Sequence, residues 1–314
     1  ASLNAALAKP LGSAFAGTSF SFLVGVCSLT LLYPFSLGNT HQRRSPPPPP
    51  SPPGAAPAST WMYVVPGCIG AFFVSLATAI GPHLGFSLFF VCLVLGQLTM
   101  ALVVDNIGLL GTAKSRLTCW KILAVVLVLA GALMAVVERL QLSGEDHAGL
   151  TVLYVGLTIV AGALMTVQVA VTNAFTRIVG TYPHRTALLA FSVGCAIVLA
   201  IWGVAAATST SFRHPDFAAT EVWQYFGGCL GAAYVAASVT LAPELGVALW
   251  FIVVVAGQLT AAVLIDGLGL FNVAQKNITA LRAAGVCVTF VGAIAYRLAP
   301  SIANEPDTEG AVGM

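Results

Sequence analysis

Two matched groups of polar residues interrupt an otherwise apolar sequence. Residues 82–109 and 243–270 both read Pro-x-Leu-Gly, ten residues, Gly-Gln-Leu-Thr, five residues, Asp-x-x-Gly. Glutamine and threonine side chains donate and accept hydrogen bonds, and a carboxylate can also carry a proton. Such groups suit the binding of a polar small molecule and the movement of a proton. They are Gln97, Thr99 and Asp105 in the first segment and Gln258, Thr260 and Asp266 in the second.

The two glutamines occupy matching depths in the predicted helices. Gln97 follows the turn glycine Gly85 at the same spacing as Gln258 follows Gly246. This spacing is about 18 Å along a helix, just past the middle of a membrane. An unpaired amide in hydrocarbon costs several kcal/mol, so each side chain needs a partner. Two interpretations stay open: helix–helix contact beside the preceding glycine, and hydrogen bonding to a substrate.

The two aspartates lie near the same helix faces as the glutamines but closer to the membrane surface. Asp105 and Asp266 follow the glutamines by eight residues, or about 12 Å of helix. A carboxylate at this depth is a candidate for coupling transport to protons or another cation. The alternative is a structural role, either as an anchor at the interface or as an ion-pair partner of Lys114, Lys121, Lys276 or Arg282.

A third polar group is predicted on the helix over residues 150–176. Gln168 and Thr172 are one turn apart and share a face. Asn173 matches Asn4 when the starts of the two copies are aligned, and we expect Gln168 and Asn173 to contribute amides to the same substrate site. The sequence holds no HExxH motif, cysteine–histidine cluster or phosphate-binding loop, so no metal, cofactor or catalytic residue is predicted.

The composition of the chain is that of a membrane protein. Of its 314 residues, 58% are hydrophobic and 8% are charged, with a net charge of +2. A soluble domain carries about 25% charged residues, so the composition excludes a soluble enzyme, a nucleic-acid binder and a disordered protein. Charge-free stretches predict nine complete spanning helices, over residues 14–34, 61–79, 84–104, 118–138, 150–176, 185–207, 223–241, 246–265 and 280–298.

The chain contains an internal duplication. When residue 82 is aligned with residue 243, 14 of the 28 positions in 82–109 are identical to those in 243–270. Each copy is predicted to hold five helices, and an odd number forces the second copy to enter the membrane in the opposite direction. The predicted fold class is an all-α integral membrane protein, a ten-helix inverted-repeat (5+5) transporter bundle whose truncated first helix lies in residues 1–11. The first repeat is placed at 1–140, the second, inverted repeat at 150–299 and a polar tail at 300–314.

The loop predicted over residues 35–60 contains a proline-rich stretch, Ser45–Pro57. Because proline does not continue a helix, an extended spacer is predicted, with a docking peptide for a partner protein as the alternative. Loops on the side of the termini carry eight Lys and Arg residues against five on the other side, which favours cytoplasmic termini. The predicted location is integral to a plasma, inner or organelle membrane.

The repeated pattern resembles the YdcZ-like family of inner-membrane exporters in the drug/metabolite transporter superfamily, in its tandem ten-helix form. The resemblance covers nearly the whole chain apart from the proline-rich loop and residues 301–314. It implies a ten-helix inverted-repeat transporter and no particular substrate. The residues that carry it are Pro82, Gly85, Gly96, Gln97, Asp105 and Gly108, with Pro243, Gly246, Gly257, Gln258, Asp266 and Gly269.

We therefore expect a secondary transporter or exporter of a small organic metabolite or drug-like compound, working by alternating access between the repeats. The expected partners are the lipid bilayer, a small-molecule substrate and, for coupling, protons, with a homodimer left open and nucleic acid excluded. The alternative is a non-transporting scaffold or receptor that docks partners through the proline-rich loop. A water-accessible cavity lined by the amides separates the two functions, because a scaffold would be packed solid there.

Overall fold

The computed structural model describes residues 2–38, 59–112, 114–137, 148–208, 215–268 and 278–299. Within these ranges the chain forms ten α-helices, and nine of them are long and apolar enough to cross a membrane. Large apolar side chains such as Leu31, Val152 and Leu298 are exposed, as expected for a surface that faces lipid. The predicted all-α membrane bundle is thus confirmed.

The helices follow the predicted order, and most extend beyond the predicted ends, because an α-helix satisfies its own backbone groups in an apolar setting. The first repeat contains α1 (Ser2–Ala8), α2 (Ala14–Gly38), α4 (Trp61–Leu84), α5 (Phe86–Ile107) and α6 (Cys119–Val136). The second contains α7 (Ala148–Val179), α8 (Pro183–Thr208), α9 (Phe226–Leu245), α10 (Val247–Leu268) and α11 (Ala280–Leu298). Of these, α6 is shorter than predicted and α11 has the predicted bounds. Short 3₁₀ turns η1, η4 and η5 cover Leu109–Gly111, Phe217–Ala219 and Val222–Tyr225.

Helix α2 continues to Gly38, into the region predicted as loop. Residues 39–58 of that predicted loop, which include the proline-rich stretch, lie outside the described residues, as does the tail from residue 300.

The connections α4–α5 and α9–α10 each consist of a single glycine. The sequence predicted that the preceding helices end at residues 79 and 241, but Pro82 and Pro243 still lie inside these helices. Gly85 and Gly246 have φ of +78° and +86° with extended ψ, a backbone conformation that is accessible to glycine alone at little cost. Each helix therefore runs up to the joint, and the following helix starts at once in the opposite direction.

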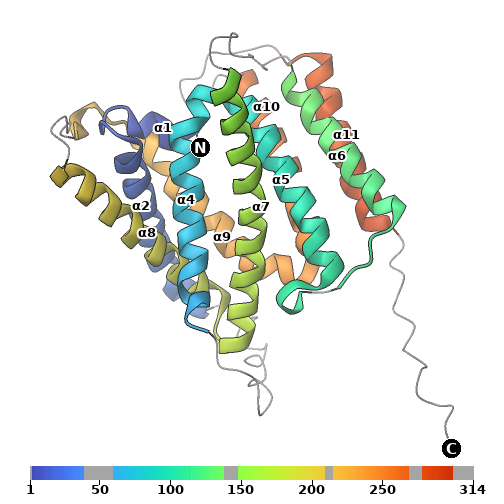
Figure 1. Cartoon of the computed structure of the whole chain (residues 1–314), viewed down its shortest axis with the longest axis horizontal. Coiled ribbons are helices and arrows are strands. Elements are labelled where there is room, and N and C mark those ends of the chain that lie inside the picture. Colours follow the sequence, from blue (N-terminus) through green and yellow to red (C-terminus); the bar gives the residue numbers. More distant parts are fainter. Residues whose placement is uncertain are drawn as a thin grey trace, which may run out of the picture.

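The two repeats are inverted relative to each other. Helices α6 and α11, the fifth helix of each copy, pack closely through glycines: a Cβ on Gly285 would lie 2.5 Å from the amide nitrogen of Ala135, and one on Gly292 would lie 2.9 Å from the carbonyl oxygen of Ala124. Residue numbers rise along one helix as they fall along the other, so the pair is antiparallel. In Figure 1, α5 and α10 likewise run in opposite directions.

Equivalent contacts occur twice across the repeat interface. A Cβ on Gly25 in α2 would lie 3.2 Å from the carbonyl oxygen of Gly228 in α9, and one on Gly194 in α8 would lie 3.1 Å from that of Gly67 in α4. Gly25 corresponds to Gly194, and Gly67 corresponds to Gly228. A pseudo-twofold axis therefore relates the two copies, as the inverted-repeat interpretation requires.

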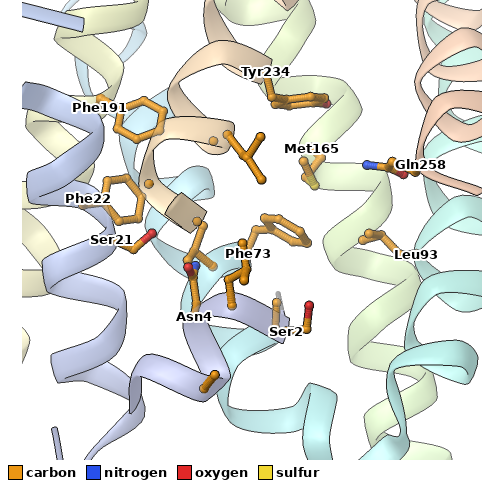
Figure 2. Close-up of a pocket in the computed structure, with 18 of the residues that line it drawn as sticks. Ser2, Asn4, Ser21, Phe22, Phe73, Leu93, Met165, Phe191, Tyr234 and Gln258 are labelled. Atoms are coloured by element: carbon orange, nitrogen blue, oxygen red, sulfur yellow. The ribbon is translucent and has the colours of Figure 1, made fainter. Parts of the chain in front are cut away.

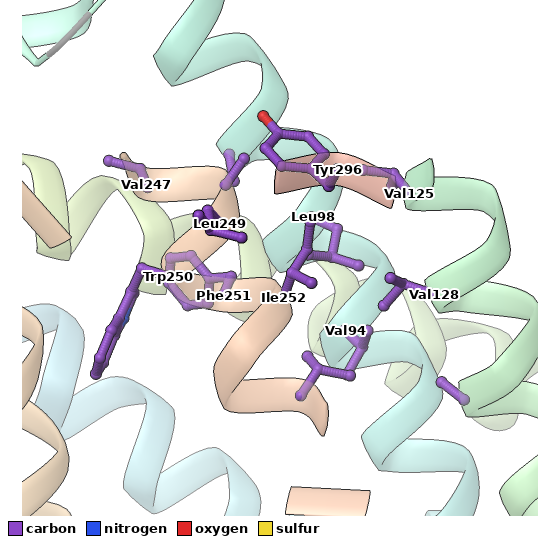
Figure 3. Close-up of a cluster of buried hydrophobic side chains, with 14 of the residues drawn as sticks. Val94, Leu98, Val125, Val128, Val247, Leu249, Trp250, Phe251, Ile252 and Tyr296 are labelled. Atoms are coloured by element: carbon purple, nitrogen blue, oxygen red, sulfur yellow. The ribbon is translucent and has the colours of Figure 1, made fainter. Parts of the chain in front are cut away.

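A hydrophobic core joins the fourth and fifth helices of both copies (Figure 3). Its fully buried members include Val94 and Leu98 from α5, Val128 from α6, and Phe251 and Ile252 from α10. Burial of such side chains inside a bilayer contributes through close packing rather than through exclusion of water. This cluster packs α5 and α6 of the first repeat against α10 of the second.

Candidate functional site

A cavity of about 590 Å³ lies between the repeats (Figure 2). We call it the axial cavity, because three pairs of equivalent residues line it. Its volume falls within the range of about 300–1,000 Å³ that is typical of small-molecule sites. The pairs are Phe22 with Phe191, Phe73 with Tyr234, and Gln97 with Gln258.

The first of these pairs places the axis of symmetry directly. The rings of Phe22 in α2 and Phe191 in α8 contact each other, with their centroids 5.1 Å apart. Two equivalent residues can touch only where the pseudo-twofold axis passes between them. The axial cavity is thus shared equally by the repeats, and the two predicted glutamines reach it from opposite copies, as Figure 2 shows for Gln258.

Gln97 is held tightly by α7 and still faces the axial cavity. Its side chain is 1% exposed, its Nε2 donates to the sulfur of Met165 at 3.6 Å, and its Oε1 has no hydrogen-bond partner among the described residues. Its backbone carbonyl accepts a hydrogen bond from the hydroxyl of Thr166 at 3.0 Å. The close approach depends on Gly96, where a Cβ would overlap the carbonyl oxygen of Ile159. The backbone of Gln97 and its Nε2 thus make the predicted helix–helix contact, while hydrogen bonding of the side chain to a substrate stays a prediction.

Gln258 occupies a different environment from its counterpart. Its side chain is exposed, and it lines the axial cavity together with a second cavity of about 290 Å³. We call this the lateral cavity; it lies between the first turn of α5 and the C-terminal half of α10. No described atom lies within 4 Å of a Cβ built on Gly257, whereas Gly96 is fully packed. The two copies thus share a sequence pattern and differ in packing.

The other predicted substrate residues do not line the axial cavity. The Gln168 amide faces Gly70 of α4, and Asn173 is buried within the helix bundle. Thr99 is exposed, and the hydroxyl of Thr260 donates to its own helix at the carbonyl of Ala256.

Asn4, the counterpart of Asn173, reaches the axial cavity instead, as Figure 2 shows. It is 6% exposed and its Oδ1 has no hydrogen-bond partner among the described residues. The side chain presses against the start of α9, where a Cβ on Gly227 would overlap the Asn4 oxygen. Repeat matching pointed to Asn4, but the same matching gave no reason to choose it over Asn173.

The Asp105 carboxylate joins the two repeats at the N-terminus of α10. Its Oδ1 accepts a hydrogen bond from the backbone N–H of Val247 at 3.0 Å, and its Oδ2 accepts one from Ala248 at 2.8 Å. The first turn of a helix has free N–H groups and a partial positive charge, so a carboxylate there is doubly stabilised. This Asp105 cap is buried, with 4% of the side chain exposed.

The hydrogen bonds of Asp105 to described residues go to α10 rather than to the basic side chains that the sequence offered as one alternative. Lys121 is also buried, but its ammonium donates to the hydroxyl of Ser115 and the carbonyl of Arg116. Asp266 belongs to α10, and its side chain lies outside the described part of the structure. Among the described residues, no group of histidine, cysteine or acidic side chains is placed to hold a metal ion.

The loop after Asp105 is fixed to α7 of the other repeat. The Arg177 guanidinium donates to the carbonyl oxygens of Leu110 and Gly111. Leu110 has a φ of +54°, a strained value for a leucine. The backbone N–H of Ser115 donates to the Asp105 carbonyl at 2.7 Å and closes the loop. The C-terminal end of α5, which positions the cap, is therefore held from both repeats.

The helices, the inverted repeats and the shared cavity define a polytopic membrane protein of the transporter class. The family model described as "Putative inner membrane exporter, YdcZ" matches residues 1–134 and 153–295, one region in each repeat. The chain belongs to this family. A search of curated proteins found no match to the sequence.

Proposed function

We propose that the chain is a secondary transporter that moves a small organic molecule by alternating access between its two inverted repeats. The family is one of exporters rather than of enzymes. The observation that carries the proposal is that the axial cavity lies on the pseudo-twofold axis, while equivalent positions in the first turns of α5 and α10 are packed differently. When the two repeats exchange these packing arrangements, a molecule bound on the axis becomes accessible from the other side of the membrane.

The difference is clearest at the first turns of α10 and α5. Val247 is 2% exposed beneath the Asp105 cap, while its counterpart Phe86 is 37% exposed. Ala248 is completely buried, while its counterpart Ser87 lines the lateral cavity. The first turn of α10 is therefore covered, while the first turn of α5 is partly uncovered. The reverse arrangement, with α5 capped and α10 released, would complete the transport cycle.

The cap also gives a route for coupling to protons. Both of its hydrogen bonds are strengthened by the charge on Asp105, since bonds to a charged acceptor are about twice as strong as neutral ones. A proton bound to this carboxylate weakens both bonds and favours release of α10. Because Asp266 is equivalent to Asp105 in the inverted repeat, its protonation would favour release of α5 at the opposite end of the molecule. We propose that both termini lie in the cytoplasm.

A pair of equivalent cysteine substitutions tests the proposal. In a variant without native cysteines, Ser87→Cys and Ala248→Cys are each labelled with a water-soluble maleimide in nanodiscs, where both faces of the membrane are reachable. We expect rapid labelling at position 87 and slow labelling at position 248. Adding Asp105→Ala should accelerate labelling at 248 at least tenfold and slow it at 87, because opening one end closes the other.

A rigid scaffold would behave differently in the same experiment. Position 248 would stay unreactive or would gain reactivity while labelling at position 87 stayed constant. Either result would refute alternating access. The melting temperature of each variant in detergent provides the folding control, because a globally unfolded protein would expose both cysteines.

A further inference from the structure

We infer that the axial cavity binds a ring-containing organic molecule that presents N–H donors and carries no negative charge. This inference rests on the proposed function and narrows its substrate class. It is carried by two buried oxygen atoms without partners, by aromatic walls and by the absence of charged side chains among the described residues that line the cavity.

The two oxygens are the strongest feature. The side chains of Gln97 and Asn4 line the cavity, and their oxygens, Oε1 and Oδ1, are buried and accept no hydrogen bond from a described residue. A buried acceptor without a partner is unfavourable, so native proteins satisfy nearly all such groups. A ligand that donates N–H groups to both oxygens would restore these bonds, whereas a ligand with acceptors alone would leave them unsatisfied.

The walls favour a flat apolar ring. Phe22, Phe73, Phe191, Trp223 and Tyr234 all line the cavity. Figure 2 shows the rings of Phe73 and Tyr234 on the side where Met165 and Gln258 lie, and Phe22 and Phe191 on the other side. Aromatic side chains stack on flat ring systems and also attract cations through their faces. Donors at one edge of such a ligand would then meet the amides.

Charge excludes the anionic alternative. None of the side chains that line the axial cavity within the described residues is basic or acidic. A carboxylate or phosphate moved from water into such a site loses its hydration without gaining a positive partner. A neutral amide or a delocalised cation loses less, and its N–H groups bond to Gln97 and Asn4. The site therefore favours ligands whose N–H donors reach Gln97 and Asn4, and it disfavours ligands with a negative charge.

Three compounds of nearly equal shape separate these properties. 2-Naphthamide is neutral with N–H donors, 2-naphthamidine is a cation with N–H donors, and 2-naphthoate is an anion with acceptors alone. Binding is measured by the ligand-dependent rise in melting temperature of the full chain in detergent, which follows from selective binding to the native state. We expect the amide and the amidine to stabilise the protein and the naphthoate to leave the melting temperature unchanged.

Two variants assign the effect to the site. Gln97→Leu should weaken binding of the amide and the amidine about tenfold, while Gln168→Leu, which removes an amide that does not line the cavity, should not change it. Gln97→Glu should strengthen binding of the amidine relative to the amide by at least tenfold, a selective change that a folding defect cannot produce.

The inference is overturned if naphthoate binds as tightly as the amide, if no compound binds, or if Gln97→Leu leaves both affinities unchanged and Gln97→Glu leaves their ratio unchanged. Those outcomes leave the cysteine labelling experiment untouched, so a wrong substrate class is distinguishable from a wrong function. Labelling that fails to exchange between positions 87 and 248 would instead refute transport while the binding preference could still be measured.

Discussion

Removal of the Asp105 cap is the sharpest test of how the repeats are held closed. The substitution Asp105→Ala deletes both acceptors at the first turn of α10 and leaves the N–H groups of Val247 and Ala248 buried without partners. The helices themselves keep their sequences and their apolar faces. We therefore expect local opening of α10 from α5 rather than loss of the fold.

The magnitude follows from the two bonds. Hydrogen bonds to a charged group contribute about 1.5–3 kcal/mol each, while replacing an exposed N-cap residue by alanine costs about 0.5–2 kcal/mol in total. The cap is buried but its two bonds share one carboxylate, so we expect a loss of about 3 kcal/mol. At about 1.4 kcal/mol per factor of ten, the opening equilibrium rises roughly a hundredfold.

Amide hydrogen exchange measures that equilibrium directly, because the exchange rate of a protected N–H follows the population of the open state. Peptides that cover residues 246–252 are compared between the wild-type protein and Asp105→Ala in nanodiscs. Exchange at Val247 and Ala248 should accelerate about a hundredfold. Asp105→Asn keeps one acceptor and places an N–H₂ group against the other donor. Its exchange rate should lie between those of the wild-type protein and Asp105→Ala.

Asn106→Ala is the matched control. Asn106 is adjacent in sequence, and its side-chain oxygen accepts from the backbone N–H of Leu117 in the loop rather than from α10. This variant should leave exchange in α10 unchanged. Unchanged protection of Val247 and Ala248 in Asp105→Ala, or equal acceleration in Asn106→Ala, would contradict the role assigned to the cap.

Four further substitutions test the packing within and between the two copies. Gly96→Ala should lower the melting temperature by an amount equivalent to about 1–3 kcal/mol, because its Cβ overlaps α7. Gly257→Ala should preserve the melting temperature. It should slow the exchange of cysteine labelling between positions 87 and 248, because α10 needs this glycine surface when it packs as α5 does. Gly285→Ala should separate α6 from α11 and reduce the melting temperature similarly; an unchanged value would mean that the contact is dispensable. Arg177→Ala should accelerate amide exchange around Leu110 about tenfold, and unaltered exchange would show that the loop holds its conformation unaided.

Much of the fold could be predicted because membrane helices are encoded by simple physical requirements. Long apolar stretches such as 280–298 had to become helices, since only a helix satisfies its backbone in hydrocarbon. The inversion followed from an odd helix count in each copy, and the antiparallel packing of α6 on α11 agrees with it. The helix ends were less accurate near Pro82 and Pro243, because a proline in the last turn does not end a helix when glycine supplies the joint.

The site was less predictable because equivalent sequences occupy different environments. Gln97 and Gln258 belong to identical Gly-Gln-Leu-Thr motifs, yet one is buried against α7 and the other is exposed. Repeat matching cannot choose between Asn4 and Asn173 for the same reason. The aromatic pair Phe73 and Tyr234 could have been found by extending the alignment of the two copies, but aromatic residues are common in any bundle. The Asp105 cap depends on a contact between repeats that no local pattern encodes.

The contact between Phe22 and Phe191 has a consequence for how such a protein can change over time. In an assembly of two identical five-helix chains, a substitution at this position would be present on both sides of the same contact and would have to be compatible with itself. Joining the copies in one polypeptide removes that restriction. Each side can then vary alone, as Phe73 and Tyr234 already do, and a cavity that began symmetric can come to hold an asymmetric molecule in a single orientation.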